Sequence, residues 1–134
     1  MPADDSAPLF RKVDCVQLSV PDLNEALEFY QRRLGHDLVW RSGDSAGLRM
    51  PDTDTEIVLQ TVRSGMEINM LVDSTDAAAS RFVESGGKVL VPPFDIQIGR
   101  CVVVEDPWGN TLVLLDMSVG PLVTDENGNV VSGP

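Results

Sequence analysis

The sequence has few of the residues that build metal sites and reactive nucleophile sites. It contains one histidine, His36, and two cysteines, Cys15 and Cys101, whereas a catalytic zinc site normally takes three protein ligands. The cysteines lie far apart, and residues 1–8 are polar and acidic, so they do not read as a secretory signal. We therefore expect reduced thiols and a cytoplasmic protein.

Positive charge and long apolar runs are also scarce. Ten Lys and Arg stand against 21 Asp and Glu, which gives a net charge of −11 and argues against binding to nucleic acid or to acidic membranes. No apolar run approaches the roughly 20 residues of a membrane-spanning helix. The 134 residues are enough for one domain with its own core.

The first half of the chain has a strand, a helix and then three short strands. Val13–Val20 alternates polar and apolar residues, which predicts a strand. Asp22 is a natural N-cap with Glu25 three residues later, and apolar residues recur at helical spacing until Gly35, so we predict one amphipathic helix. The strand-like segments that follow are residues 37–40, 46–50 and 56–61.

The second half repeats this plan at a shift of 52 residues, which carries Val20 onto Val72 and Gly35 onto Gly87. We predict an α+β fold of two tandem βαβββ modules that form a curved mixed sheet cup, with both helices covering one side. The predicted organisation is a flexible lead over residues 1–11, one domain over 12–117 with modules at about 13–61 and 66–116, and a tail over 118–134. An Asn-Gly pair predicts a loose hairpin or lid in the tail, although disorder is equally arguable.

Three segments resemble the vicinal oxygen chelate superfamily, which is the glyoxalase, bleomycin resistance protein and extradiol dioxygenase group. They are "VDCVQLSVPDLNEALEFYQRRLG", "INMLVDSTDAAASRFVESGG" and "VEDPWGNTLVLLD". The resemblance covers about residues 13–116. It implies the paired βαβββ fold, a ligand cup and, frequently, a homodimer.

The resemblance also implies four strand positions that supply metal ligands in the metal-using members. In this chain those positions are Cys15, Val58, Glu67 and Val113. Two of them are hydrocarbon, so we interpret the metal site as lost and expect no cofactor. One alternative remains at this point: a one-residue slip of the last strand would turn Asp116 inward as a possible ligand.

Without a metal, the open sheet face offers a mixture of polar and apolar groups that suits a small organic molecule. Gln17 and Asn69 could contact such a ligand, or could bond to each other across the repeat, and Glu67 is a candidate base. The candidate ligand-binding residues are Cys15, Gln17, Trp40, Arg49, Val58, Glu67, Asn69, Arg100, Trp108 and Val113. The two arginines are the expected anion partners.

The favoured hypothesis is a metal-free small-molecule-binding protein of the glyoxalase and bleomycin-resistance type, and not an enzyme. One alternative is a metal-dependent lyase, isomerase or dioxygenase of the same superfamily. The other is a metal-independent enzyme with Glu67 as its base. The expected partners are a small organic ligand and a second copy of the chain.

Overall fold

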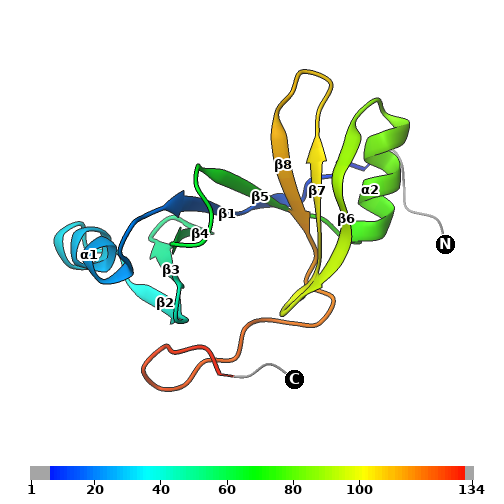
Figure 1. Cartoon of the computed structure of the whole chain (residues 1–134). Coiled ribbons are helices and arrows are strands. Elements are labelled where there is room, and N and C mark those ends of the chain that lie inside the picture. The colour runs from blue at the N-terminus through cyan, green and yellow to red at the C-terminus, as the bar shows by residue number, and fades with distance from the viewer. Residues whose placement is uncertain (1–6, 132–134) are drawn as a thin grey trace. The chain divides into compact units, whose positions relative to one another are not determined.

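The computed structural model describes residues 7–131, which divide into two compact units. The first unit comprises Asp14–Glu67 and residues 122–131, and the second comprises residues 7–13 and Ile68–Pro121. Each unit contains one helical segment and one four-stranded mixed sheet (Figure 1). The predicted α+β fold of two βαβββ modules is confirmed. No helix in the described part is long and apolar enough to cross a membrane.

The sheet of the first unit has the strand order β2-β3-β4-β1. Its parallel pair is β1 with β4, whereas β3 is antiparallel to both of its neighbours. The strands are β1 (Lys12–Ser19), β2 (Leu38–Arg41), β3 (Ser45–Met50) and β4 (Thr53–Gln60).

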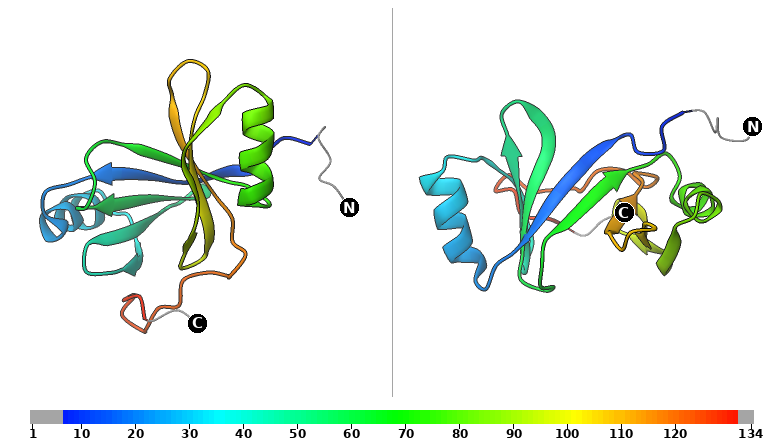
Figure 2. Two further views of the ribbon diagram at one scale, coloured as in Figure 1. Left: turned by 45° about the vertical axis from the view of Figure 1, so that its right-hand side comes forward. Right: turned by 90° about the horizontal axis from the view of Figure 1, so that it is seen from above.

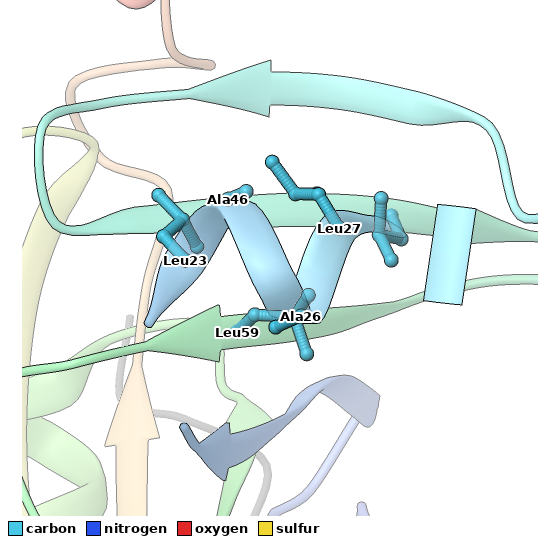
Figure 3. Packing of buried hydrophobic residues seen from close by; sticks show 6 residues of the cluster. Leu23, Ala26, Leu27, Ala46 and Leu59 are labelled. Atoms are coloured by element: carbon cyan, nitrogen blue, oxygen red, sulfur yellow. The ribbon is translucent and has the colours of Figure 1, made fainter. Parts of the chain in front are cut away.

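Helix α1 (Leu23–Leu27) begins at Asp22, whose carboxylate accepts a 2.9 Å hydrogen bond from the Glu25 N–H. This bond satisfies one of the donors that a helix start leaves unpaired. The apolar stripe of α1 packs on the sheet, because its side chains recur at helical spacing. The packed side chains in Figure 3 include Leu23, Ala26, Leu27, Ala46 and Leu59.

The prediction of one regular helix up to Gly35 is only partly correct. After α1 the chain widens into a π-helical segment, η1 (Glu28–Arg33), in which the Leu34 N–H bonds to the Phe29 carbonyl, five residues back. Gly35 then ends the segment at φ +84, a left-handed conformation that favours glycine.

The sheet of the second unit has the strand order β5-β8-β7-β6, with β5 and β8 parallel. Helix α2 (Thr75–Glu84) is capped by the Ser74 hydroxyl and packs against β6, β7 and β8, and Figure 2 shows it beside the sheet. The strands are β5 (Glu67–Leu71), β6 (Lys88–Ile96), β7 (Gly99–Glu105) and β8 (Thr111–Leu115). The core between α2 and the sheet comprises Val72, Ala78, Ala79, Val102, Val104 and Leu114.

Strand β6 continues through Pro92 and Pro93 to Ile96. Proline lacks the N–H that a strand donates, so it is found mainly on edge strands and at bulges. Accordingly β6 lies at the end of the strand order, and its register with β7 shifts on either side of Val91.

At both ends of the chain, the residues that the structure describes contact one of the two units. Leu9 and Phe10 pack against the core under α2, which corrects the expectation of a flexible lead for those residues; residues 1–6 lie outside the described residues. The tail forms the predicted hairpin, with the Gly128 carbonyl accepting from the Arg41 N–H and the Val130 N–H donating to the Arg41 carbonyl. The hairpin thus pairs with the edge of β2.

Candidate ligand-binding site

The face of the first sheet opposite α1 carries half of the predicted ligand-binding residues. Leu18, Ile57 and Leu59 pack toward α1, and side chains alternate along a strand, so their neighbours point to the other face. The register of β1 with β4 pairs Cys15 with Glu56 and Gln17 with Val58. We call this the polar face, and its residues are Cys15, Gln17, Ser19, Trp40, Gly47, Arg49, Glu56, Val58 and Gln60.

Trp40 reaches the polar face because of a bulge in β2. Leu38 pairs with Leu48, but Trp40 pairs with Gly47, so one extra residue, Val39, interrupts the alternation. The Trp40 Nε1 then donates a 2.7 Å hydrogen bond to Glu56 Oε1. A Cβ at position 47 would collide with the indole, so the close approach requires glycine there.

A polar chain connects Glu67, Arg63, Gln17 and Cys15. Arg63 Nε and Nη2 bond to the two carboxylate oxygens of Glu67 at 2.8 and 3.1 Å, and Nη2 also bonds to Gln17 Oε1 at 2.7 Å. Gln17 in turn hydrogen-bonds to Cys15. Arg63 therefore takes up one acceptor position of the Gln17 amide oxygen.

The thiol of Cys15 is protonated at neutral pH. Burial, together with the negative charges of Asp14 and Glu56, raises its pKa from 9.0 to about 12, although the hydrogen bond with Gln17 opposes the rise. A thiol needs to lose its proton to act as a nucleophile or as a metal ligand. Cys15 is accordingly an inert, buried group of this face.

The second sheet also has a face opposite its helix, and this face is mostly apolar. Val113 and Leu115 cluster there with Cys101, while Leu114 between them belongs to the core under α2. Asn69 pairs with Val113 in the register of β5 with β8, so it shares this face. Asn69 is 6% exposed, and its Oδ1 has no hydrogen-bond partner among the described residues.

The alternative register of the last strand, with Asp116 as an inward ligand, is wrong. The Asp116 carboxylate accepts hydrogen bonds from the Thr75 N–H at the start of α2 and from the Arg100 N–H. Burial alone would raise its pKa, but hydrogen bonds from Ser118, Thr75 and Arg100 outweigh burial and hold the pKa at about 2. Asp116 joins the sheet to the helix.

Two predicted ligand contacts lie away from these faces. Arg100 shares the helix side of β7 with Val102, and its guanidinium already bonds to Asp95 at 2.7 Å and Asp76 at 3.2 Å. These two carboxylates raise its pKa. Trp108 is 83% exposed in the β7–β8 turn, so we leave both residues out of the site.

The donor groups do not fit the divalent ion that the resemblance implies. Val58 and Val113 have no donor atom, Cys15 keeps its proton, and Glu67 is bonded to Arg63. Over residues 7–131, no three His, Cys, Asp or Glu side chains gather in a metal-binding arrangement.

Neither Arg63 nor the role of Glu56 was predicted from the sequence. Arg63 lies in the turn between β4 and β5, outside any periodic segment, so the strand pattern carries no signal for it. The bond of Glu56 to Trp40 depends on the bulge in β2. An irregular strand pairing of this kind is a tertiary property that alternation does not report.

A family model described as Glyoxalase/Bleomycin resistance protein/Dioxygenase superfamily matches residues 12–114. No curated protein matches the sequence. Among solved structures, methylmalonyl-CoA epimerase from Mycobacterium tuberculosis has a TM-score of 0.70 at 21% identity, over 83% of this chain and 91% of that one.

Two further structures show the same fold. A protein described as NAD-dependent benzaldehyde dehydrogenase from Legionella pneumophila has a TM-score of 0.64 at 21% identity, over 77% of this chain and 97% of that one. Homoprotocatechuate 2,3-dioxygenase from Brevibacterium fuscum has a TM-score of 0.63 at 22% identity, over 83% of this chain and 38% of that one. At these identities the similarity concerns the fold, because one fold supports many activities.

Proposed function

This chain belongs to the Glyoxalase/Bleomycin resistance protein/Dioxygenase superfamily, and from that premise we propose that it is a metal-free protein that binds a small organic molecule on the polar face. The donor set of this face carries the proposal. Where metal-using members would hold an ion, the face has an aliphatic side chain at Val58 and a protonated thiol at Cys15.

The polar chain from Glu67 to Cys15 favours binding over chemistry. Arg63 fixes both the Glu67 carboxylate and the Gln17 amide in hydrogen bonds, so these groups keep one orientation before a ligand arrives. Preorganised polar groups lower the entropic cost of binding. Apolar walls with a few oriented polar groups are the usual composition of a ligand pocket.

The second unit offers a contact of its own. The buried carbonyl of Asn69 lies beside Val113 and Leu115 without a partner among the described residues. An unpaired buried acceptor costs about 1–3 kcal/mol. We propose that it accepts a hydrogen bond from an N–H or O–H group of a bound molecule.

Catalysis by Glu67 has less support. A general base must lie within hydrogen-bond reach of the proton that it removes, whereas two hydrogen bonds to Arg63 already hold the Glu67 carboxylate in place. A metal-dependent reaction would need donors other than Val58 and Val113. The following experiment separates the metal-dependent alternative from binding.

The first experiment is native mass spectrometry of gently purified protein, with elemental analysis of the same sample. We expect no stoichiometric transition metal and an additional organic mass on the protein. One metal ion per chain would contradict the proposal and favour the metal-dependent enzyme.

A variant pair assigns the bound mass to the polar face. Gln17→Leu removes the amide at nearly constant size, so the additional mass should be lost. Gln31→Leu makes the same change on the exposed surface of η1 and should retain it. Retention of the mass by both variants would contradict the assignment to the polar face.

We also propose a homodimer, which the resemblance implies, in the cytoplasm. Light scattering at micromolar concentration should give twice the chain mass, and a monomer mass would contradict this. Both cysteines are free and buried, which suits a reducing compartment.

A further inference from the structure

Arg49 and Glu56 face each other on neighbouring strands but do not form an ion pair. The register of β3 with β4 pairs them directly, a position at which opposite charges normally attract. The Glu56 carboxylate instead accepts the 2.7 Å hydrogen bond from Trp40 Nε1. Among the described residues, the Arg49 guanidinium has no hydrogen bond or ion pair.

The Arg49 guanidinium borders a pocket of about 380 Å³ within the first unit. Val39, Met50 and Pro51 supply apolar walls, and Arg49 is the one basic group of the lining. The remaining lining residues are Thr53, Asp54 and Glu56. In a chain with net charge −11, an unpaired guanidinium beside apolar walls is a specific feature of this pocket.

We propose that the pocket binds the carboxylate of a small organic acid through Arg49, and that Trp40 is the positioning residue that keeps Glu56 from neutralising it. This rests on the proposed function and names the chemical class of its ligand. The planar guanidinium donates two parallel hydrogen bonds to a carboxylate. The apolar walls then contact the hydrocarbon part of the acid.

A carboxylate fits better than a phosphate because of the neighbouring charges. Asp54 and Glu56 border the same pocket, and each repels a bound anion in proportion to the charge of that anion. A monoanion therefore loses less to repulsion than a phosphate dianion does. The preference for a monoanion thus arises from repulsion by Asp54 and Glu56 as well as from attraction by Arg49.

The test is calorimetric titration of the full chain with hexanoate, hexanol and inorganic phosphate. We expect saturable binding of hexanoate and at least about tenfold weaker binding of hexanol and phosphate. Arg49→Gln should weaken hexanoate by about tenfold or more. Arg33→Gln is the matched control, because the Arg33 guanidinium likewise has no partner within residues 7–131 but lies in η1, and it should leave the affinity unchanged.

The role of Trp40 has its own readout. Trp40→Phe removes the Nε1–H, releases Glu56 to pair with Arg49 and should weaken hexanoate binding. Adding Glu56→Gln removes the competing charge and should restore the affinity, whereas a merely structural role of Trp40 would give no rescue.

Several outcomes would overturn the inference. They are no hexanoate binding to the wild type, equal affinity for hexanol or phosphate, an unchanged affinity in Arg49→Gln, or no rescue in the double variant. An organic mass that still depends on Gln17 would in that case leave the proposed function intact, so the two failures are distinguishable.

Discussion

The carboxylate of Asp116 accepts a 2.9 Å hydrogen bond from the backbone N–H of Thr75, although 41 residues separate them in the chain. The bond ties the end of β8 to the first turn of α2, where a helix has unpaired donors and favours negative charge. Gly99 makes room for this contact, because a Cβ there would collide with Asp116.

The Asp116 carboxylate should make the free energy of unfolding depend on pH in the acidic range. Its pKa falls from 3.8 to about 2 on folding. The contribution of Asp116 to the free energy of unfolding is therefore complete when the pH is above the pKa of the unfolded chain. It is lost as the pH falls through the pKa of the folded protein. The contribution is roughly 2 kcal/mol. Urea unfolding at pH 7 and pH 2.5 should show a smaller acid-induced loss in Asp116→Asn than in the wild type. Asp52→Asn, in an exposed turn, should behave like the wild type.

Gly47→Ala should displace Trp40. The added Cβ would collide with the indole and with Glu56, and overpacking typically costs about 1–3 kcal/mol. We expect a lower melting temperature and a changed Trp40 fluorescence, measured in a Trp108→Phe background. Gly43→Ala is the matched control, because a Cβ at Gly43 meets nothing within 4 Å. Equal effects of the two substitutions would contradict the packing of Trp40 on Gly47.

Cys15 should resist alkylation in the folded protein. Its side chain is buried, and its pKa of about 12 leaves almost no thiolate at pH 8. Iodoacetamide at pH 8 should label Cys15 at a far lower rate in buffer than in urea, as measured by peptide mass spectrometry. Because the folded pKa exceeds the unfolded one, stability should also fall as pH rises from about 9 toward 12. Rapid labelling of Cys15 in the folded protein would contradict this environment.

Arg63→Met should affect binding more than stability. The side chains of Arg63 and Glu67 are 52% and 25% exposed, and a pair this open to water contributes at most about 1 kcal/mol. The melting temperature should therefore change little, while the organic mass on the polar face should be lost because Gln17 loses its anchor. Arg32→Met breaks the exposed pair with Glu28 and should retain the mass. A large fall in melting temperature with retained mass would show that Arg63 contributes to stability more than to binding.

Truncation after Pro121 should expose the edge of β2. The tail hairpin covers the Arg41 N–H through the Gly128 carbonyl, at 2.8 Å. Hydrogen exchange should therefore become much faster at Arg41 in the truncated chain, while the amide of Leu59 in the core serves as the internal control. Unchanged protection at Arg41 would mean that the hairpin does not hold this edge in solution.

The sequence predicted those parts of the fold that rest on regular periodicity. Polar and apolar residues alternate through β1, and the faces of Gln17 and Val58 followed from that alternation together with the resemblance. The cap at Asp22 was predicted because a helix start requires an acceptor at that position. The last strand was ambiguous, because both of its faces are apolar and alternation alone does not choose between them.

The site was predicted less well, because its key contacts come from irregular positions. A bulge turns Trp40 toward Glu56, and a turn residue, Arg63, reaches the polar chain. Arg100 was assigned to the ligand by its charge, yet the carboxylates of Asp95, its partner across the β6–β7 hairpin, and of Asp76, 24 residues away, already hold it. Pairings of this kind depend on the folded arrangement of the chain.

The paired prolines of β6 have a consequence for aggregation. Pro92 and Pro93 leave two successive residues without an N–H in the strand that ends the sheet of the second unit. A foreign strand therefore finds an interrupted row of donors there, together with a shifted register. The middle of this edge is a poor template for the strand addition that begins domain swapping and fibril growth.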